Sequence, residues 1–205
     1  DVVIARLAAA IETRARAELA ERLSDAPNAP RGVIRSLAHD EIVVARSVLA
    51  RSERLSDDDL VAVALAKGRD HMLAITERSV LTEPVTDVLV KRGDRVVVHA
   101  VAGNPGARFS EGSIATLVDR SRADEALQTL LGQRSDLPEA HVRPLMVIAK
   151  ETARRRLAEA LPEASSPDID IAVEWSATKL ESVVVPGGRD YSAALAEISE
   201  RTAVR

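Results

Sequence analysis

A pattern that recurs every 26 to 28 residues constrains the fold of this 205-residue chain more than any other feature. Each copy has an apolar residue, then Ser, Thr or Pro, then usually acidic residues and a short run of apolar periodicity. We call the second residue of each copy its anchor. The anchors are Pro30, Ser56, Thr82, Ser110 and Pro138. Successive anchors lie 26, 26, 28 and 28 residues apart. Ser and Thr accept hydrogen bonds from the free N–H groups of a first helical turn, and Pro fits that turn. Each anchor therefore predicts the start of a helix.

Apolar residues also recur at fixed distances after each anchor. The positions four, seven and eight residues on are almost all apolar, which is the spacing of one buried helical stripe. The column at the seventh position consists of Leu37, Val63, Leu89, Leu117 and Leu145. Thr86 interrupts the column at the fourth position, where the neighbouring Val85 can supply the apolar contact. We expect these columns to form the core.

A second helix is expected between successive anchors. An aspartate followed three residues later by an aliphatic residue recurs at Asp40, Asp70, Asp94 and Asp124. Asp is a favourable N-cap, so the pattern predicts helices over 41–52, 71–79, 95–103 and 125–133. A pair of short helices cannot cover its own apolar face, so the pairs must stack. The predicted fold is all-α: an α-α superhelix, or solenoid, of about five short helix pairs with flanking helices.

The flanking segments complete the predicted domain organisation. Longer helices are expected over 3–23 and 138–160, within a repeat domain 1–162 that is followed by a helical extension 163–205. Residues 163–175 leave two alternatives open, because Ser165 to Asp168 resembles a helix start while Asp168 to Trp175 alternates as a strand would; helix is favoured. A last helix is expected over 191–202, after the Pro-Gly-Gly break at 186–188. The chain begins with Asp rather than Met, which suggests a piece of a longer protein.

Composition excludes several classes of function. The chain has no cysteine, which rules out disulfides, thiolate nucleophiles and cysteine metal sites. A net charge of -4 does not fit a dedicated nucleic-acid binder, and one Trp, one Tyr and one Phe are too few for a base-stacking platform. No uncharged apolar run approaches the roughly 18–20 residues that cross a bilayer. We therefore expect no cofactor, no metal, no membrane insertion and no enzymatic activity.

Four histidines are the remaining candidates for chemistry. His71 and His99 occupy the same repeat position, so they could lie on neighbouring repeats and share a metal; the alternative, which we favour, is two partly exposed histidines at helix starts. His39, followed by Asp40, Glu41 and Ile42, is similar to the phospho-accepting box of histidine kinases. An N-cap at Asp40 would instead place His39 in a turn.

Two further features have competing interpretations. The turn Asn104-Pro105-Gly106 is either an exposed loop for a partner or, as we favour, the end of a helix that Pro cannot continue. Several basic residues are either a binding patch for anions or, as we favour, solvated faces offset by nearby acids: Lys91, Arg92, Arg95, Arg120, Arg122 and Arg154 to Arg156.

The repeats resemble HEAT-like and leucine-rich-repeat-variant helical solenoids. The chain more closely resembles an uncharacterised family, domain of unknown function 2336, found mainly in alphaproteobacteria. The motifs that carry this likeness follow in order: HDEIVVARSVLARSERLSDDDL (39–60), LTEPVTDVLVKRGD (81–94), NPGARFSEGSIATLV (104–118), QRSDLPEAHVRPL (133–145) and GGRDYSAALAEI (187–198). The resemblance implies a helical-repeat fold and a cytoplasmic setting. It carries over no catalytic residue, because the family has no assigned reaction.

The expected function is that of a non-enzymatic module for protein–protein interaction. Solenoids present long surfaces to partners, and the outward positions five and nine residues after each anchor mix charged with apolar residues. We predict that this ridge binds a protein partner through polar contacts of Arg35, Lys91 and Arg143. The alternative is a signalling component, either a sensor or a phosphotransfer protein that works through His39. Binding of nucleic acid is a third and weaker hypothesis, which the net charge opposes.

Overall fold

The structure, a computed structural model, describes the backbone of residues 2–183 and the side chains of residues 12–177. In this part of the chain it has eleven helices and no strand, only one isolated bridge between Leu81 and Ala107, so the all-α prediction is confirmed. The chain divides into two compact units, residues 1–113 and 114–205. The predicted helix 191–202 lies outside the described residues. The predicted domain boundary after residue 162 stays a prediction.

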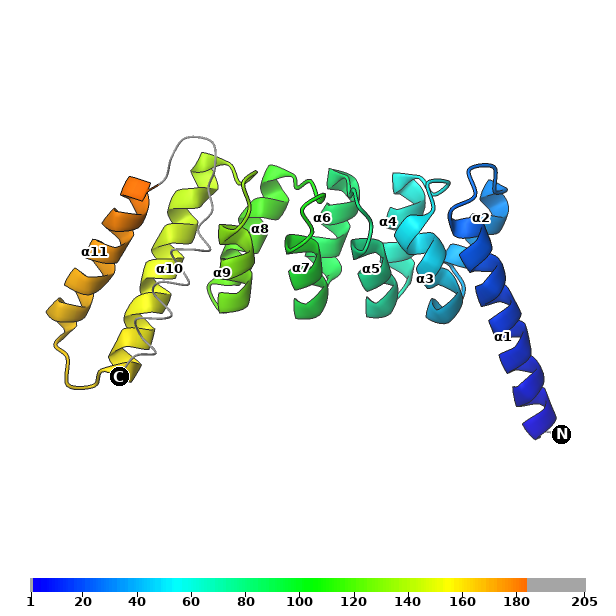
Figure 1. Cartoon of the computed structure of the whole chain (residues 1–205), viewed down its shortest axis with the longest axis horizontal. Helices are drawn as coiled ribbons and strands as arrows, with labels where there is room; N and C mark the ends of the chain where they lie inside the picture. Colours follow the sequence, from blue (N-terminus) through cyan, green and yellow to red (C-terminus); the bar gives the residue numbers. More distant parts are fainter. Residues whose placement is uncertain (1, 184–205) are drawn as a thin grey trace. The chain divides into compact units, whose positions relative to one another are not determined.

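The first unit is built from seven helices in two layers. They are α1 (Val2–Ser24), α2 (Arg31–Ala38), α3 (Ile42–Arg51), α4 (Asp57–Ala66), α5 (Arg69–Thr76), α6 (Glu83–Arg92) and α7 (Arg95–Ala102). In one layer α1, α3, α5 and α7 pack side by side in that order, and in the other α4 packs on α6 (Figure 1). The two helices of each predicted pair also contact each other across the layers: α2 with α3, α4 with α5, and α6 with α7.

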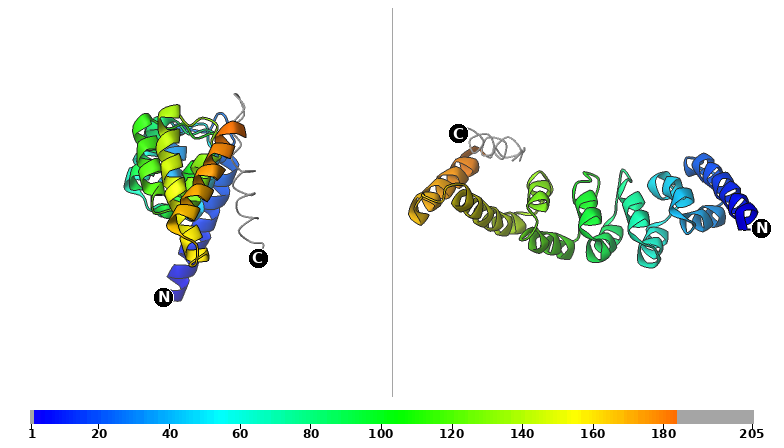
Figure 2. Two further views of the ribbon diagram at one scale, coloured as in Figure 1. Left: turned by 90° about the vertical axis from the view of Figure 1, so that its left-hand side faces the viewer. Right: turned by 90° about the horizontal axis from the view of Figure 1, so that it is seen from below.

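The second unit holds two long helices near the C-terminal end. The helix α8 (Glu111–Ser121) crosses the unit boundary and is followed by α9 (Glu125–Gly132), α10 (Glu139–Ala160) and α11 (Ser166–Val183). The helix α10 packs against α9 and α11, and Figure 2 shows α10 and α11 as neighbours. Residues 166–175 are helical, so the favoured alternative for this segment is confirmed. None of the described helices has the length and apolar character needed to span a bilayer.

The anchors begin helices as predicted, but only Ser56 and Ser110 accept a first-turn N–H with their side chains, and Thr82 does not. Pro30, Ser56, Thr82 and Pro138 are the N-cap residues of α2, α4, α6 and α10, and α8 begins directly after Ser110. The strongest cap is a reciprocal capping box, in which Ser56 Oγ accepts from the Asp59 N–H at 3.3 Å and Asp59 Oδ2 accepts from the Ser56 N–H at 3.0 Å. Local sequence therefore determines where these helices start.

Two of the four aspartate caps are wrong and two are confirmed. Asp94 and Asp124 accept N–H bonds from the first turns of α7 and α9. The N-cap of α3 is Glu41 instead of Asp40, because the Asp40 carboxylate is held by Arg16 of α1, with an Nε–Oδ2 distance of 2.6 Å. The helix α5 begins after the extended Gly68, which leaves Asp70 exposed in its first turn.

The predicted apolar columns are buried. All five residues at the seventh position are at most 7% exposed, and Leu89 is completely buried. Thr86 also belongs to the core, because its Oγ1 donates to the Arg108 carbonyl at 2.6 Å and so has a partner away from water. In the last copy Val142 and Met146 are only half-buried. The columns therefore predict burial best in the first four copies.

The turn Asn104-Pro105-Gly106 joins two neighbouring interhelical loops. Asn104 Nδ2 donates to the carbonyls of Thr76 and Arg78 at 2.9 and 2.7 Å, while Asn104 Oδ1 accepts from the Gly106 N–H at 2.7 Å. A Cβ added to Gly106 would lie 1.8 Å from the Ser79 carbonyl oxygen, so only glycine fits this close approach. The structural interpretation of the turn is confirmed, and its role extends beyond ending a helix.

The buried column generates the first prediction. Leu89→Asp would place an unpaired charge at a completely buried site, which costs several kcal/mol. This is comparable to the total stability of about 5–15 kcal/mol of a domain. We expect circular dichroism to show loss of helix in the variant, whereas the same change at the exposed Leu65 should leave the helical signal intact. A folded Leu89→Asp protein would contradict the repeat register.

The cap at Asp94 generates a pH-dependent prediction. A hydrogen bond from the Val97 N–H, assisted by Arg69, lowers the pKa of Asp94 below its usual range. Such a carboxylate stabilises the fold above its unfolded pKa of about 3.9, and this contribution disappears as the pH falls through the folded pKa. We expect Asp94→Asn to lower the urea midpoint of unfolding near neutral pH. The difference from the wild type should shrink at acidic pH, and a constant difference would contradict the assignment.

Candidate interaction surface

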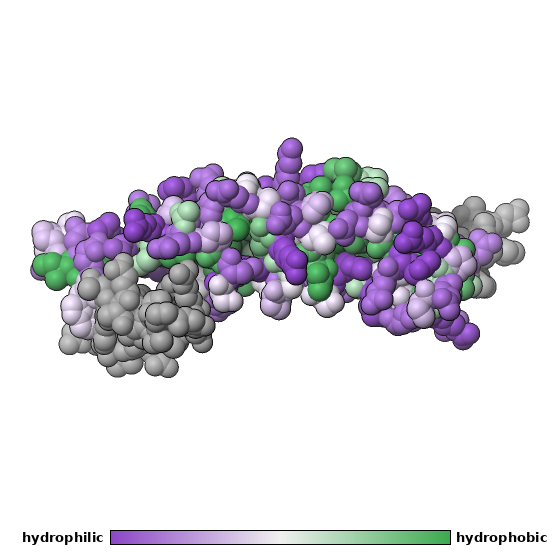
Figure 3. Space-filling model, turned by 90° about the horizontal axis from the view of Figure 1, so that it is seen from above, coloured by the Kyte–Doolittle hydropathy of each residue, from purple (hydrophilic) through white to green (hydrophobic). Residues whose placement is uncertain are grey.

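The outward positions of α2, α4 and α6 form a mixed surface on the first unit. We call its residues the ridge: Arg35, His39, Val61, Leu65, Asp87 and Lys91. Leu65 is 52% exposed, although it lies on a helix whose other leucine, Leu60, is buried. Figure 3 shows a molecular face that is mainly hydrophilic with small hydrophobic patches. An exposed leucine among charged side chains is the kind of site where a partner gains apolar burial.

Two members of the ridge are engaged within the fold. Arg35 Nε lies 2.7 Å from Asp59 Oδ1 and so links α2 to α4. Burial works to raise the pKa of Asp59, but hydrogen bonds from Ser56 and Arg35 outweigh it, so this pKa is lowered. Asp87 accepts hydrogen bonds at 2.6 Å from both Ser110 Oγ and Ser113 Oγ. Asp87 is therefore a structural link from α6 to the start of α8.

The other predicted contact residues differ in their surroundings. The Lys91 side chain is exposed at the end of α6 and makes no hydrogen bond or ion pair within the described part of the chain. Arg143 is likewise exposed, on α10 of the second unit, where Val147 is 53% exposed. The structure thus brings Arg35 and Lys91 to one layer of one unit, on either side of α4. Arg143 belongs to a separate surface.

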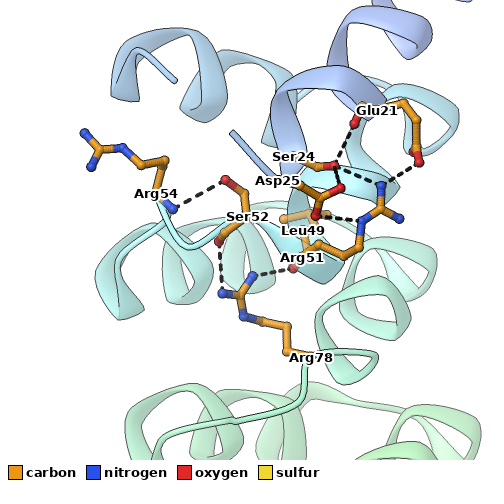
Figure 4. Close-up of polar contacts among 8 residues, drawn as sticks. All are labelled: Glu21, Ser24, Asp25, Leu49, Arg51, Ser52, Arg54 and Arg78. Carbon is orange, nitrogen blue, oxygen red and sulfur yellow. Dashed lines mark hydrogen bonds and ion pairs between the residues drawn. The ribbon is translucent and has the colours of Figure 1, made fainter. Parts of the chain in front are cut away.

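Other arginines bind backbone carbonyls, a role that the sequence analysis missed. Arg78, in the loop after α5, donates from Nη1 to the Leu49 carbonyl at 2.8 Å and from Nη2 to the Ser52 carbonyl at 3.0 Å (Figure 4). Both carbonyls lie at the C-terminal end of α3, where no further N–H of the helix can reach them. Burial lowers the pKa of Arg78 from its ordinary value.

The same contact recurs along the first unit. Arg92, at the end of α6, donates to the carbonyls of Ala64 and Leu65 at the end of α4, and Asn104, after α7, donates to Thr76 at the end of α5. Arg54, after α3, donates to the Ala29 carbonyl, in the loop after α1, at 3.2 Å. Arg92 and Asn104, like Arg78, each follow by two helices the helix end that they cap, whereas the carbonyl that Arg54 binds lies in a loop. This spacing of about one repeat is the sequence signal that could have identified these residues.

Most of the candidate anion-binding cations are paired with acids or bound to carbonyls. Arg122 pairs with Asp119, Arg154 with Asp170, and Arg155 and Arg156 with Glu125. Arg51 extends this pattern, since its guanidinium contacts Glu21, Asp25 and Ser24 of the α1 end (Figure 4). Most of these cations link one helix to another, which supports the interpretation that they do not form an anion-binding patch.

The histidines have separate environments. His71 is buried and its Nε2 lies 2.9 Å from the Asp40 carbonyl oxygen, so its expected partial exposure is wrong. His39 is exposed at the C-terminal end of α2, in a turn as predicted. His99 lies in the last turn of α7 rather than at a helix start. Among the described residues, no three histidine or carboxylate side chains converge as metal ligands would.

One shallow hollow of about 380 Å³ lies between α10 and α11. Leu161, Pro162 and Ile169 contribute its apolar lining, and the ion pair between Arg154 Nε and Asp170 Oδ1, at 2.6 Å, contributes its polar side. Because its two opposite charges already satisfy each other, the hollow is better explained as the seam of a helical hairpin than as a ligand site.

The carbonyl caps generate a third prediction. Arg78→Ala would leave the Leu49 and Ser52 carbonyls without their side-chain donors, which costs about 1–3 kcal/mol. Arg108→Ala is the matched control, because the Arg108 side chain is exposed and its backbone bonds survive the change. We expect urea denaturation to show a lower midpoint for Arg78→Ala alone. Equal midpoints for the two variants would show that the carbonyl contacts add nothing.

Comparisons with known proteins identify the family. Residues 44–204, more than half of the chain, match the model of a family described as an uncharacterised protein conserved in bacteria (DUF2336). No curated protein and no solved structure matches the chain. The match begins within α3 and continues beyond α11. This chain belongs to the uncharacterised bacterial family DUF2336.

Proposed function

We propose that the chain is a non-enzymatic, cytoplasmic module for protein–protein interaction, with its helix pairs stacked as a HEAT-like α-solenoid. The observation that carries the proposal is the ridge, where Leu65 is 52% exposed and lies on the helix layer that also presents Lys91. A folded helix gains nothing in water from such an exposed leucine, whereas a partner that covers it removes apolar surface from water.

The helix packing supports the solenoid. Each helix of the layer formed by α1, α3, α5 and α7 packs on the one before it, and side chains from the following repeat cap helix ends. Contacts between neighbours in sequence are what stacked repeats require. Such stacking extends the ridge over successive repeats of the first unit.

The engaged polar groups support a non-enzymatic role. The buried His71 binds a backbone carbonyl, and the carboxylates with lowered pKa values hold helices together or cap them. Asp40, for example, has its pKa lowered by the hydrogen bond from Arg16. The perturbed groups thus have structural partners, whereas a catalytic site needs such groups directed at a substrate.

The ridge generates a fourth prediction. We expect the triple variant Arg35→Glu, Lys91→Glu and Arg143→Glu to lose the partners that the wild-type chain retains in a pull-down from its native organism. Lys91→Glu and Arg143→Glu should hardly change thermal stability, since exposed charges contribute up to about 1 kcal/mol each. Arg35→Glu should lower it further, because it replaces the ion pair with Asp59 by a repulsion between two carboxylates. The single variants show whether the ridge, the surface at Arg143 or both are needed.

Leu65→Asp provides a sharper version of the same experiment. Its matched control is Val96→Asp, which alters a valine with 51% exposure in the other layer. We expect Leu65→Asp to abolish retention and Val96→Asp to preserve it, with helical content unchanged in both. Retention by the triple variant and by Leu65→Asp would place the binding surface elsewhere.

A second candidate function is phosphotransfer through His39. The observation in its favour is that the His39 side chain is exposed in a turn, where a kinase could reach it. Asp40 next to it is held by Arg16 and is therefore not free to act on the imidazole. Acid-labile phosphate on His39 after incubation with a cognate kinase would support this function, and its absence would exclude it.

A further inference from the structure

The helix α4 has no polar side beyond its first turn. Every residue from Leu60 to Ala66 is apolar, so any side of this segment that faces water is apolar too. Leu60 is buried, whereas Ala62, Leu65 and Ala66 are exposed. A helix that is apolar all round is ordinarily covered on all sides. We call Ala62, Leu65 and Ala66 the α4 face, and its composition is that of a contact surface.

Three cations lie at the C-terminal end of α4. Lys67 is the C-cap of α4, while Lys91 and Arg92 end α6, which packs on α4. Arg92 Nη1 donates to the carbonyl of Ala64 at 3.2 Å and also to the carbonyl of Leu65, so the end of α6 lies next to the end of α4. We call Lys67, Lys91 and Arg92 the cationic rim.

The positive charge of the rim is not neutralised by ion pairs. Among the described residues, no carboxylate pairs with any of the three cations. The carboxylates at the adjoining helix starts have other partners, because Arg16 holds Asp40 and Arg69 contacts Asp94. The C-terminal ends of α4 and α6 contribute only about half a negative charge each, which three cations outweigh. The rim thus differs from Arg154 to Arg156, which are paired with acids.

We propose that the α4 face and the cationic rim together bind an acidic segment of a partner protein, through one bulky apolar side chain and a nearby carboxylate. The inference rests on the proposed function and names the chemistry of the partner. The small alanines beside Leu65 leave room for the bulky side chain, whose burial removes apolar surface from water. Lys91 would pair with the carboxylate, while Arg92 adds its charge and keeps its carbonyl bonds.

The packing of the helices sets the spacing that the partner needs. Packed helices lie about 8–10 Å apart, and an extended chain advances about 3.3 Å per residue. A carboxylate about three residues from the apolar side chain would therefore reach from Leu65 on α4 to Lys91 on α6. We expect the partner to carry an acidic and a bulky apolar residue at this separation.

An NMR titration of the isotope-labelled full chain tests the proposal, because chemical-shift changes detect weak complexes. The probe is a synthetic Ser-rich peptide with one Leu and a Glu three residues to either side of it. We expect amide shift changes confined to the ends of α4 and α6. Lys91→Glu should weaken binding about tenfold, since it replaces an attraction by a repulsion. The spectra themselves show whether each variant is folded.

The matched control is Arg31→Glu. It makes the same change of net charge at the exposed start of α2, away from the ends of α4 and α6, and should bind the peptide as the wild type does. A peptide with Lys in place of both Glu residues should not bind. Equal binding by this peptide, or by Lys91→Glu, would overturn the proposal. Shift changes caused by anionic vesicles or duplex DNA but not by the Glu peptide would overturn it as well, in favour of another class of partner.

The pull-down separates this inference from the proposed function. If the Glu peptide leaves the spectrum unchanged while Leu65→Asp loses the native partners, the ridge binds a partner that is not acidic, and only this inference fails. If the Glu peptide binds the wild type at the α4 face while Leu65→Asp retains every native partner, the chemistry of the site is supported and the proposed role of the ridge fails.

Discussion

The carbonyl groups at helix C-termini impose the constraint on which the first unit depends. The helices α2 to α7 contain only 8 to 10 residues, and the last four carbonyls of any helix have no intrahelical partner. Short helices therefore leave a large share of their backbone acceptors unsatisfied. Arg78, Arg92 and Asn104 supply donors from two helices further along the chain. The ends of α3, α4 and α5 are thus completed by side chains of the next repeat, which ties successive helices together.

This requirement also shapes the surface that is available for function. Arginines that bind carbonyls or carboxylates cannot bind a partner without giving up a structural contact. Arg92, for example, is committed to the end of α4, while the adjacent Lys91 is exposed and makes no such contact among the described residues. The proposed interaction surface is therefore small, with Lys91 and Leu65 on the first unit and Arg143 treated separately.

The helices that pack together begin earlier in the chain than the region that matches the family. The match begins at residue 44, whereas α1 packs against α3 and receives contacts from Arg51 and, through Arg16, from Asp40. Residues before the matched region thus cover the first matched helix. At the other end the match continues past α11, to residue 204.

The sequence by itself determined the helix pairs, their starting anchors and their buried columns, because caps and helical periodicity act over a few residues. It could not place Asp40, whose carboxylate binds Arg16 from 24 residues earlier, or His71, which binds the Asp40 carbonyl 31 residues away. It likewise missed Arg78 and Arg92 as carbonyl donors. The tertiary structure decided which polar groups are engaged and which are exposed, because a hydrogen bond between distant residues depends on packing that no local pattern records.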